Sequence, residues 1–365
     1  MIDSSPSSEV LVDADALIAY GRDLFIAAGM LREDALLTAE QLVTADLRGV
    51  ESHGVVRMPI YVERLRHGVV AAQPVMRVVR ETAGSAVFDG GNGMGQVVGQ
   101  RAMELAVAKG REHGDPVFVS VRNSNHFGAA AWFADIAARS DMIGLVFTIG
   151  GINHMVPWGG AEAMLGNNPF AVAFPVRGGD PVILDMACSV AARGKIIVAA
   201  KEGRPIPADW AVNRNGQPTT DAAEALEGFV APVGGPKGYA LTLTIGLIST
   251  MLSGAFFGSE VTHMYDDFEH PQNIGHLFGV LPIATFESLG IYFDRMTKAA
   301  VDIKGVRRAP GVDAIHLPGE REARLARRRR EEGLPLGAET WRDLVALGAS
   351  AGIDAPRVTS VRQPT

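Results

Sequence analysis

Amphipathic stretches at the two ends of the chain predict helices. Between residues 13 and 49, apolar positions such as Leu17, Tyr20 and Leu24 recur every three to four residues. This spacing places apolar side chains on one face of a helix. A similar period returns after about residue 313 and ends in ETWRDLVALGASAGI. Both ends of the chain therefore predict helices with one face to bury.

The middle of the chain has a different pattern. Short apolar runs, PVFVSV, MIGLVFTI, FAVAFP and PVILDMA, alternate with helical stretches and are separated by glycine and proline. This alternation is typical of strands and helices in one domain. The long apolar stretch KGYALTLTIGLISTMLSGAFFG contains glycines and hydroxyl residues, and it predicts a buried helix rather than a membrane span. We predict an α/β (α+β) fold, with residues 10–75 and 313–365 forming a helical domain and residues 76–312 a central domain.

Charge and cysteine content narrow the function classes. The 365 residues carry a net charge of −7, which disfavours nucleic acid as a partner. The basic run at residues 327–330 is followed by Glu331 and Glu332, as expected for a solvated helix face. Cys188 is the single cysteine, so no intrachain disulfide can form and a reducing compartment is expected. Residues 1–9 are expected to be disordered and lack the features of a signal peptide. We therefore expect a soluble cytoplasmic protein with no nucleic-acid and no membrane partner.

A glycine-rich loop, VFDGGNGMGQVVGQRAMELA at residues 87–106, runs from a strand into a helix as a dinucleotide-binding loop does. That motif needs glycines at its first, third and sixth positions. After Gly91 and Gly93 the sixth position is Gln96, and the next strand, PVFVSV, is followed by RNSNH without a carboxylate for the ribose. The loop therefore predicts a turn rather than a Rossmann phosphate site.

The segment ESHGVVRMPIY combines a histidine with an arginine and a tyrosine at four-residue spacing. Ser52 can orient His53, while Arg57 and Tyr61 would share a helix face with it. Pro59 indicates that a regular helix starts only there. Because the arginine fork matches a carboxylate, Arg57 is a candidate for binding an acidic substrate, and Tyr61 is a second candidate for substrate contact. An ordinary surface helix is the alternative.

A second histidine follows a strand in RNSNHFGAAAWFADIAARS. The spacing of Trp132, Phe133 and Ile136 predicts a helix that Ser124 or Asn125 could cap. His126 would then lie at the helix N-terminus, where the helix dipole favours neutral imidazole, the form that general acid–base catalysis needs. A purely structural capping role is the alternative.

Three further segments carry polar groups suited to ligands. The loop TIGGINHMVPWGGAEAMLGNNPF is rich in glycine and asparagine and lies between two strands. Asp185 ends the apolar run ILDMACS, where a carboxylate needs a partner. Lys237 in GGPKGYA can reach a phosphate, although a plain helix start would explain it as well.

The order of these motifs closely resembles the malate/L-lactate dehydrogenase-like family, which includes ureidoglycolate and sulfolactate dehydrogenases, diketogulonate reductase and piperideine-2-carboxylate reductase. The resemblance rests on Ser-His-Gly-x-x-Arg, Asn-His-Phe-Gly, Pro-Trp-Gly-Gly, Gly-Asn-Asn-Pro, Asp-Met-Ala, Pro-Thr-Thr-Asp, Gly-x-Lys-Gly and Pro-Gly-Glu, across residues 13–353. It implies a homodimer that binds NAD or NADP in a non-Rossmann fold, with a central mixed sheet and a helical domain built from both chain ends.

The resemblance also implies roles for particular residues. Proton transfer would fall either to His53, with Ser52 and Asp185, or to His126, and Arg57 would bind the substrate carboxylate. The segments that match the family's cofactor contacts contain Ile183, Leu184, Asp185, Met186, Ala187, Cys188, Ser189, Pro236, Lys237, Pro318, Gly319 and Glu320. The helix after Lys237 departs from the family pattern, because LTLTIGLIST lacks the acidic residue that relatives often carry there.

We therefore expect an oxidoreductase that moves a hydride between NAD(P) and C2 of a 2-hydroxy acid, a 2-oxo acid or a cyclic 2-imino acid. One alternative is a metal-dependent hydrolase with His53, His126 and Asp185 as ligands, although the chain has no His-x-His or His-Glu-x-x-His spacing. A binding protein that has lost catalysis is a further alternative. The sequence leaves the substrate and the choice between NAD and NADP open.

Overall fold

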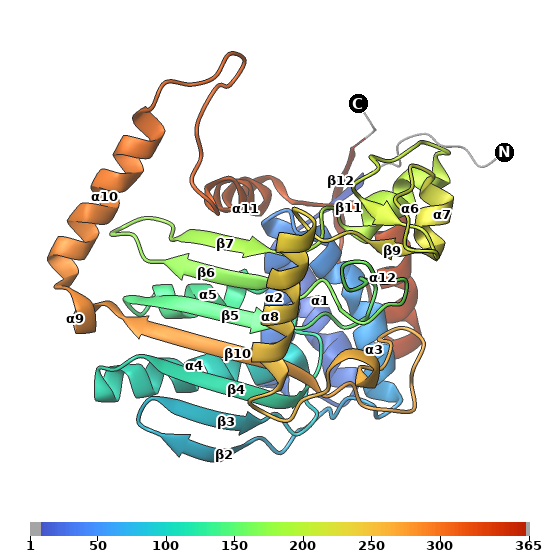
Figure 1. Cartoon of the computed structure of the whole chain (residues 1–365). Coiled ribbons are helices and arrows are strands. Elements are labelled where there is room, and N and C mark those ends of the chain that lie inside the picture. Colours follow the sequence, from blue (N-terminus) through green and yellow to red (C-terminus); the bar gives the residue numbers. More distant parts are fainter. Residues whose placement is uncertain (1–8, 363–365) are drawn as a thin grey trace.

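A seven-stranded mixed sheet forms the centre of the computed structural model, which describes residues 9–362 (Figure 1). The strand order is β2-β3-β4-β10-β5-β6-β7, and every neighbouring pair is antiparallel except the parallel pair β3 and β4. The strands are β2 (Arg77–Thr82), β3 (Ser85–Asp89), β4 (Val117–Ser124), β5 (Met142–Thr148), β6 (Phe170–Phe174), β7 (Val182–Met186) and β10 (Ile274–Pro282). The predicted fold class is confirmed. The expected disorder of residues 1–9 falls, apart from Glu9, outside the described residues.

Helices cover the two faces of this sheet (Figure 1). Helices α4 (Gly95–His113) and α5 (Ala131–Ala138) pack on one face, and α8 (Pro236–Thr250) crosses the other. Beneath α4 and α5, the aromatic rings of Phe127, Phe133 and Phe278 form a buried cluster. This apolar layer supports the strand ends from which the polar segments emerge.

Helix α8 is buried on one face only, mainly through glycine and hydroxyl residues, and exposes Leu241 and Leu247 on the other, so the expected buried helix is buried only in part. The inner face holds Gly238, Thr242, Gly246 and Ser249. A Cβ atom added at Gly246 would lie 3.0 Å from Asn168, so the close approach of helix and sheet leaves no room for larger side chains. On the outer face, Leu241, Leu247 and Met251 are 37%, 39% and 58% exposed.

The two ends of the chain share one hydrophobic core. It contains Leu17, Leu24 and Leu42 from the start of the chain and Leu334 and Leu344 from its end. The helices involved are α1 (Ala14–Ala27), α2 (Arg32–Leu47), α3 (Met58–Arg66), α11 (Glu320–Glu332) and α12 (Ala338–Ala351).

A three-stranded antiparallel sheet also joins the two chain ends, and the sequence pattern did not predict it. Its order is β11-β1-β12, with β1 (Glu9–Val12), β11 (Leu334–Gly337) and β12 (Val358–Arg362). Four- and five-residue strands give too short a pattern to recognise, and their partners lie more than 300 residues apart in the chain.

The remaining elements form a small unit beside the sheet and an arm that leaves it. The small unit contains β8 (Ala211–Val212), β9 (Phe229–Val230), α6 (Arg193–Lys201) and α7 (Ala222–Glu227), and η3 (Gly258–Glu260) follows α8. After α9 (Ile283–Phe286), helix α10 (Leu289–Gly305) projects away from the end of the central strand β10 and buries none of its residues (Figure 1). The sequence pattern did not single out α10. Within residues 9–362, no helix has the length and apolar character needed to span a bilayer.

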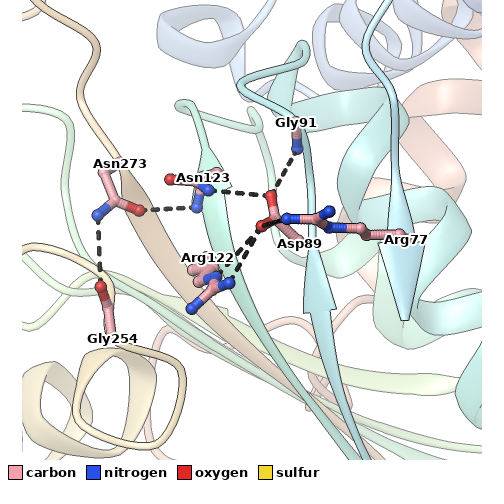
Figure 2. Close-up of polar contacts among 7 residues, drawn as sticks. All are labelled: Arg77, Asp89, Gly91, Arg122, Asn123, Gly254 and Asn273. Atoms are coloured by element: carbon pink, nitrogen blue, oxygen red, sulfur yellow. Dashed lines mark hydrogen bonds and ion pairs between the residues drawn. The ribbon is translucent and has the colours of Figure 1, made fainter. Parts of the chain in front are cut away.

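The glycine-rich loop after β3 is held by a polar network (Figure 2). The Asp89 carboxylate accepts hydrogen bonds from the Gly91 amide (3.1 Å) and the Asn123 side chain (2.9 Å), and it pairs with Arg122 (3.2 Å). Gly91 has a φ of +60°, which glycine adopts without strain. The loop is therefore a turn that is fixed by β3 and β4.

Gly95, the first residue of α4, explains why this turn is rich in glycine. A Cβ atom at this position would lie 2.2 Å from the Asn125 carbonyl oxygen and 2.5 Å from that of His126. The start of α4 therefore packs directly against the backbone of the segment that carries His126. The absence of a side chain at Gly95 therefore allows these two chain segments to pack against each other.

Gly95→Ala should destabilise the fold by about 1–3 kcal/mol, because the added methyl overlaps backbone atoms that cannot move independently. The matched control is Gly290→Ala on α10, where no heavy atom lies within 4 Å of the added Cβ. That control should be neutral or slightly stabilising. Denaturant midpoints of the two variants check this, and equal midpoints would contradict the packing argument.

Candidate active site

A cavity of about 1970 Å³ is lined by parts of α2, the turn at residues 50–57, α5, β7 and α11. Twelve of the predicted site residues lie on its wall: Ser52, His53, Arg57, His126, Ile183, Leu184, Asp185, Met186, Ala187, Ser189, Pro318 and Gly319. Five others do not line it: Tyr61, Cys188, Pro236, Lys237 and Glu320.

The two candidate histidines face each other in this cavity, although 72 residues separate them in the chain. Their rings stack with centroids 5.5 Å apart. His53 comes from the short 3-10 turn η1 (Glu51–His53), and its Nδ1 lies 2.9 Å from the Ser52 hydroxyl. Arg57 ends the next turn, η2 (Val55–Arg57), and its Nε donates to the Ser52 carbonyl at 2.7 Å. The turn thus presents Ser52, His53 and Arg57 as one unit.

Tyr61 holds His126 from behind. Its hydroxyl lies 2.6 Å from Nδ1 of His126, while its side chain is buried and does not line the cavity. Pro59 stands in the first turn of α3, as its restricted backbone predicts, and α3 carries Tyr61 toward the sheet. The sequence suggested substrate contact for Tyr61, but the structure places it against the histidine.

The surroundings keep both histidines neutral. Burial, together with the nearby charge of Arg57, lowers the pKa of His53 to about 4. Burial lowers the pKa of His126 well below its ordinary value, and His53 and Arg57 act in the same direction. Burial also raises the pKa of Tyr61 to about 12, so this phenol keeps its proton.

The start of α5 differs from the prediction. The helix begins at Ala131 with no side-chain cap, so neither Ser124 nor Asn125 caps it, and His126 lies in the preceding loop. Gly128, with a φ of +82°, keeps this loop out of the helix.

Asp185 takes the place of the missing cap. Its Oδ2 accepts the Ala131 amide at 2.8 Å, so a carboxylate from β7 stabilises the positive end of α5. Solvent reaches this carboxylate through the cavity, but the surrounding protein removes much of its hydration and raises its pKa to about 6. Among the described residues, Asp185 forms no hydrogen bond to Ser52 or His53, so these three residues do not form a hydrogen-bonded triad.

The structure brings together two of the three predicted cofactor segments. The Ile183 amide donates to the Pro318 carbonyl at 3.0 Å, and Gly319 packs on Ile183 with a φ of +86°. Residues 318–319 therefore lie along β7 on the cavity wall.

The predicted cofactor residues off the wall have other contacts. Cys188 is buried, and its thiol donates to the Asn168 carbonyl. Glu320 accepts from Lys304 at 2.8 Å. Pro236 and Lys237 are exposed at the start of α8.

Asp46, which the sequence analysis did not single out, anchors the turn that carries His53 and Arg57. This buried residue of α2 accepts the Val55 amide at 2.7 Å. A Cβ atom at Gly54 would lie 2.1 Å from the carboxylate, so only glycine fits there. From α11, Arg329 donates to the Asp46 carbonyl and pairs with Glu51 at 2.7 Å. The sequence feature that could have pointed to Asp46 is an acidic residue near the end of a helix, seven residues before His53.

Asp46→Ala should lower kcat/KM at least tenfold, because the Val55 amide loses its acceptor and the turn loosens. Asp46→Asn keeps an acceptor and should retain more activity, so it is the matched control. Steady-state kinetics of the two variants, with circular dichroism to check folding, would measure the difference. Equal losses in both variants would contradict a positioning role.

A comparison of Asp46→Asn with the wild type also gives a test of how stability depends on pH. Burial raises the pKa of Asp46 to about 8. Between about pH 4 and 8 the native state therefore binds a proton that the unfolded state releases, and the free energy of unfolding falls as pH rises, by at most about 1.4 kcal/mol per unit. Asp46→Asn should lack this slope and gain stability relative to the wild type from pH 5 to 8.

Comparison with known proteins identifies the relatives of this chain. The sequence model of the malate/L-lactate dehydrogenase family matches residues 12–345. Malate dehydrogenase of Pyrococcus horikoshii is 36% identical over 353 residues, covering 94% of this chain and 96% of that protein. Ureidoglycolate dehydrogenase (NAD(+)) of Escherichia coli K12 is 35% identical, covering 87% and 90%. The structure of sulfolactate dehydrogenase from Methanocaldococcus jannaschii has a TM-score of 0.88 at 35% identity, covering 94% and 98%.

These relatives decide between the predicted classes. They are named dehydrogenases, and some names specify NAD(+) or NADP(+), so the predicted NAD(P)-dependent class is confirmed. The metal-dependent hydrolase is not supported, and residues 9–362 contain no group of three His, Cys, Asp or Glu side chains placed to hold a metal. With the family match spanning residues 12–345 and the fold shared over 94% of the chain, the chain belongs to the malate/L-lactate dehydrogenase family.

Proposed function

We propose that this chain catalyses hydride transfer between NAD(P) and C2 of a small 2-hydroxy or 2-oxo acid, or of a cyclic 2-imino acid. The observation that carries the proposal is the group of His126, His53 and Arg57 on the wall of one cavity, which Asp185 also lines. In the reducing direction, C2 gains a hydride and the attached oxygen gains a proton. Relatives named for malate, sulfolactate and ureidoglycolate make these acids, or their oxidised forms, the first substrates to assay.

The cavity fits a dinucleotide together with a substrate. Its volume of about 1970 Å³ is roughly twice that of a pocket for one drug-sized ligand. Residues 183–187, together with Pro318 and Gly319, would hold the cofactor, since they supply exposed backbone along one wall. When bound, the cofactor supplies the hydride.

Arg57 is well placed to bind the substrate carboxylate. Its guanidinium group lines the cavity and, among the described residues, has no carboxylate within 4.0 Å. The ring of Tyr265 lies 5.6 Å from the guanidinium carbon and supports one face of the group. A carboxylate on Arg57 would place the neighbouring C2 beside the two histidines.

His126 is the favoured proton-transfer group. Because Tyr61 keeps its proton, its hydroxyl donates to Nδ1 of His126, and the neutral ring then carries its own proton on Nε2. In the reducing direction, Nε2 would give its proton to the oxygen on C2 while Nδ1 takes the proton of the Tyr61 hydroxyl, so the ring stays neutral and the negative charge passes to the Tyr61 oxygen. Both protons return in the reverse reaction. His53, stacked on this ring, raises the cost of a second positive charge beside Arg57.

His126→Ala should lower kcat about 10²- to 10⁴-fold and leave NADH affinity within a few fold, because it removes a proton donor and not a cofactor contact. His53→Ala should also be severely impaired.

Arg57→Lys keeps the positive charge but loses the planar fork of donors, so it should raise KM for the acid far more than KM for the cofactor. Oxidation of NADH and NADPH with a panel of 2-oxo acids and cyclic imines provides the assay.

The control for this series is His113→Ala, an exposed histidine at the end of α4. It should match the wild type. Near-normal kcat in folded His126→Ala and His53→Ala would show that the site is misplaced.

We also propose that the chain forms a homodimer or a larger assembly of itself. The supporting observation is apolar side chains exposed on the helices α8 and α10. The outer face of α8 carries Leu241 and Leu247, and the projecting helix α10 carries Ile291 and Val301, which are 51% and 65% exposed. Apolar surface of this kind on a folded chain marks an interaction site.

Leu247→Glu should shift the protein toward monomer in sedimentation velocity, because it places a charge in the proposed contact. Val75→Glu is the control, since Val75 is 82% exposed but lies away from α8. A wild-type protein that sediments at its monomer mass of 38.7 kDa at micromolar concentration would disprove the assembly.

The cytoplasm is the proposed location, supported by the single buried Cys188 and by the cofactor class. Fractionation of cells that express the tagged chain would test it.

A further inference from the structure

Arg64, in α3, is a buried cation that the proposed chemistry does not use. Its side chain is 2% exposed, and Nη1 donates to the backbone carbonyl groups of Met264 (3.0 Å) and Asp267 (2.8 Å). Nε and Nη2 are buried without a hydrogen-bond partner among the described residues. The Asp267 carboxylate accepts the amides of Glu269 and His270 instead. Burial of a guanidinium group with two unpaired nitrogens is costly, so stability alone does not explain Arg64.

Both of these carbonyl groups belong to residues 263–268, which we call the Tyr265 segment. It lies between η3 and β10 and contains neither helix nor strand. Phe268 adds to its attachment. The Arg64 guanidinium carbon lies 5.9 Å from the centre of the Phe268 ring, and the His67 ring, at the end of α3, lies 4.9 Å from it. The Tyr265 segment is therefore fastened to α3, with Arg64 as its main point of attachment.

The Tyr265 segment also reaches the groups that line the cavity. The side chain of Met264 is buried, and a Cβ atom at Gly151 would lie 3.3 Å from its Sδ and 3.5 Å from Cβ of His126. Tyr265 lines the cavity, and the centre of its ring lies 5.6 Å from the guanidinium carbon of Arg57. Arg64 itself does not line the cavity, so it can influence a bound substrate only through this segment.

Few protein groups hold the guanidinium group of Arg57. Its Nε donates to the Ser52 carbonyl at 2.7 Å, and within residues 9–362 its two terminal nitrogens form no hydrogen bond. These terminal nitrogens are donors that can bind a carboxylate in parallel. A single hydrogen bond leaves the group able to rotate, and the ring of Tyr265 packed beside it restricts this rotation.

We propose that Arg64 and Tyr265 are positioning residues for Arg57. Arg64 fixes the Tyr265 segment on α3, and the segment places the Tyr265 ring beside the guanidinium group, whose terminal nitrogens then meet the substrate carboxylate in one orientation. This assignment rests on the proposed function, because it concerns the alignment of the group that binds the substrate. Since C2 adjoins that carboxylate, the same alignment sets the distance between C2 and His126.

Tyr265→Ala tests the contact with Arg57. It should raise KM for the acid about 3- to 30-fold, as expected for the loss of a cation–π contact, and should change KM for NADH or NADPH less than threefold. Tyr265→Phe keeps the ring and should retain most of the wild-type affinity for the acid. Steady-state kinetics with oxaloacetate, or with the acid of the panel that is turned over fastest, measure both values.

Arg64→Met tests the attachment of the segment, because it removes the donors and fills the buried space with an unbranched apolar side chain. It should raise KM for the same acid by a similar factor and leave KM for the cofactor within threefold. Arg64→Lys keeps a cation that can donate to carbonyl groups, and it should restore most of the loss. A purely structural role for Arg64 would reduce the amount of active protein, and thus kcat, without raising KM for the acid.

A combination of Arg64→Met with Tyr265→Ala shows whether Arg64 acts through Tyr265. KM for the acid should equal that of Tyr265→Ala alone, because both changes remove the same contact. Phe268→Ala loosens the segment without altering Arg64 and should also raise KM for the acid, so the test remains available if Arg64→Met does not fold. The matched control is Arg66→Met, an exposed arginine of α3 that contacts Ser350 at 3.5 Å and should match the wild type.

The outcomes separate this inference from the proposed function. Unchanged KM for the acid in folded Tyr265→Ala, Arg64→Met or Phe268→Ala overturns the positioning role and leaves the proposed function standing. Multiplied effects in the double variant overturn it as well, because Arg64 would then act by another route. An equal rise in KM for the cofactor also overturns it, because the segment would then hold the cofactor. No oxidation of NADH or NADPH by the wild type with any acid of the panel contradicts the proposed function itself.

Discussion

The hydrogen bond between Tyr61 and His126 joins the two halves of the site. Tyr61 belongs to the core that the chain ends share, whereas His126 follows a strand of the central sheet. The bond engages Nδ1 of the ring, so Nε2 is the nitrogen left for a ligand. If the two cores shifted by an ångström, this contact and the stacking of His53 on His126 would be lost together. The chemistry proposed for the cavity therefore depends on how firmly the cores are held.

Several unrelated contacts hold that arrangement. On one side, Asp46 accepts the Val55 amide and fixes the turn with Ser52, His53 and Arg57. On the other, Gly95 allows α4 to begin against the backbone of His126. Buried His276 bonds to Ser124 at 2.9 Å and to Thr148 at 2.6 Å, which locks the strand ends beneath the same segment. The loops of the site are thus supported on rigid elements from several sides.

Within the cavity, burial shifts the pKa values of the titratable groups more than individual ion pairs do. Burial is the largest cause of the lowered histidine pKa values and of the raised pKa of Asp185. Neutral rings and unpaired guanidinium groups then coexist without neutralising each other. A cavity in this state is suited to a ligand that brings several negative charges, and both an acidic substrate and a dinucleotide do so.

The sequence by itself determined the class of fold, the family and twelve of the residues that line the cavity. Local patterns carry this information, because the period of apolar residues reflects one helix or strand, and motifs such as Ser-His-Gly-x-x-Arg are contiguous. Only the tertiary structure decided that Tyr61 stands behind His126, that Asp185 caps α5, that Asp46 anchors the turn with His53, and that Arg193 and His154 line the cavity. Each of these depends on contacts between segments that are distant in the chain or on the burial of a single atom. A one-dimensional pattern does not record which side chains lose their water or which partners they find in exchange.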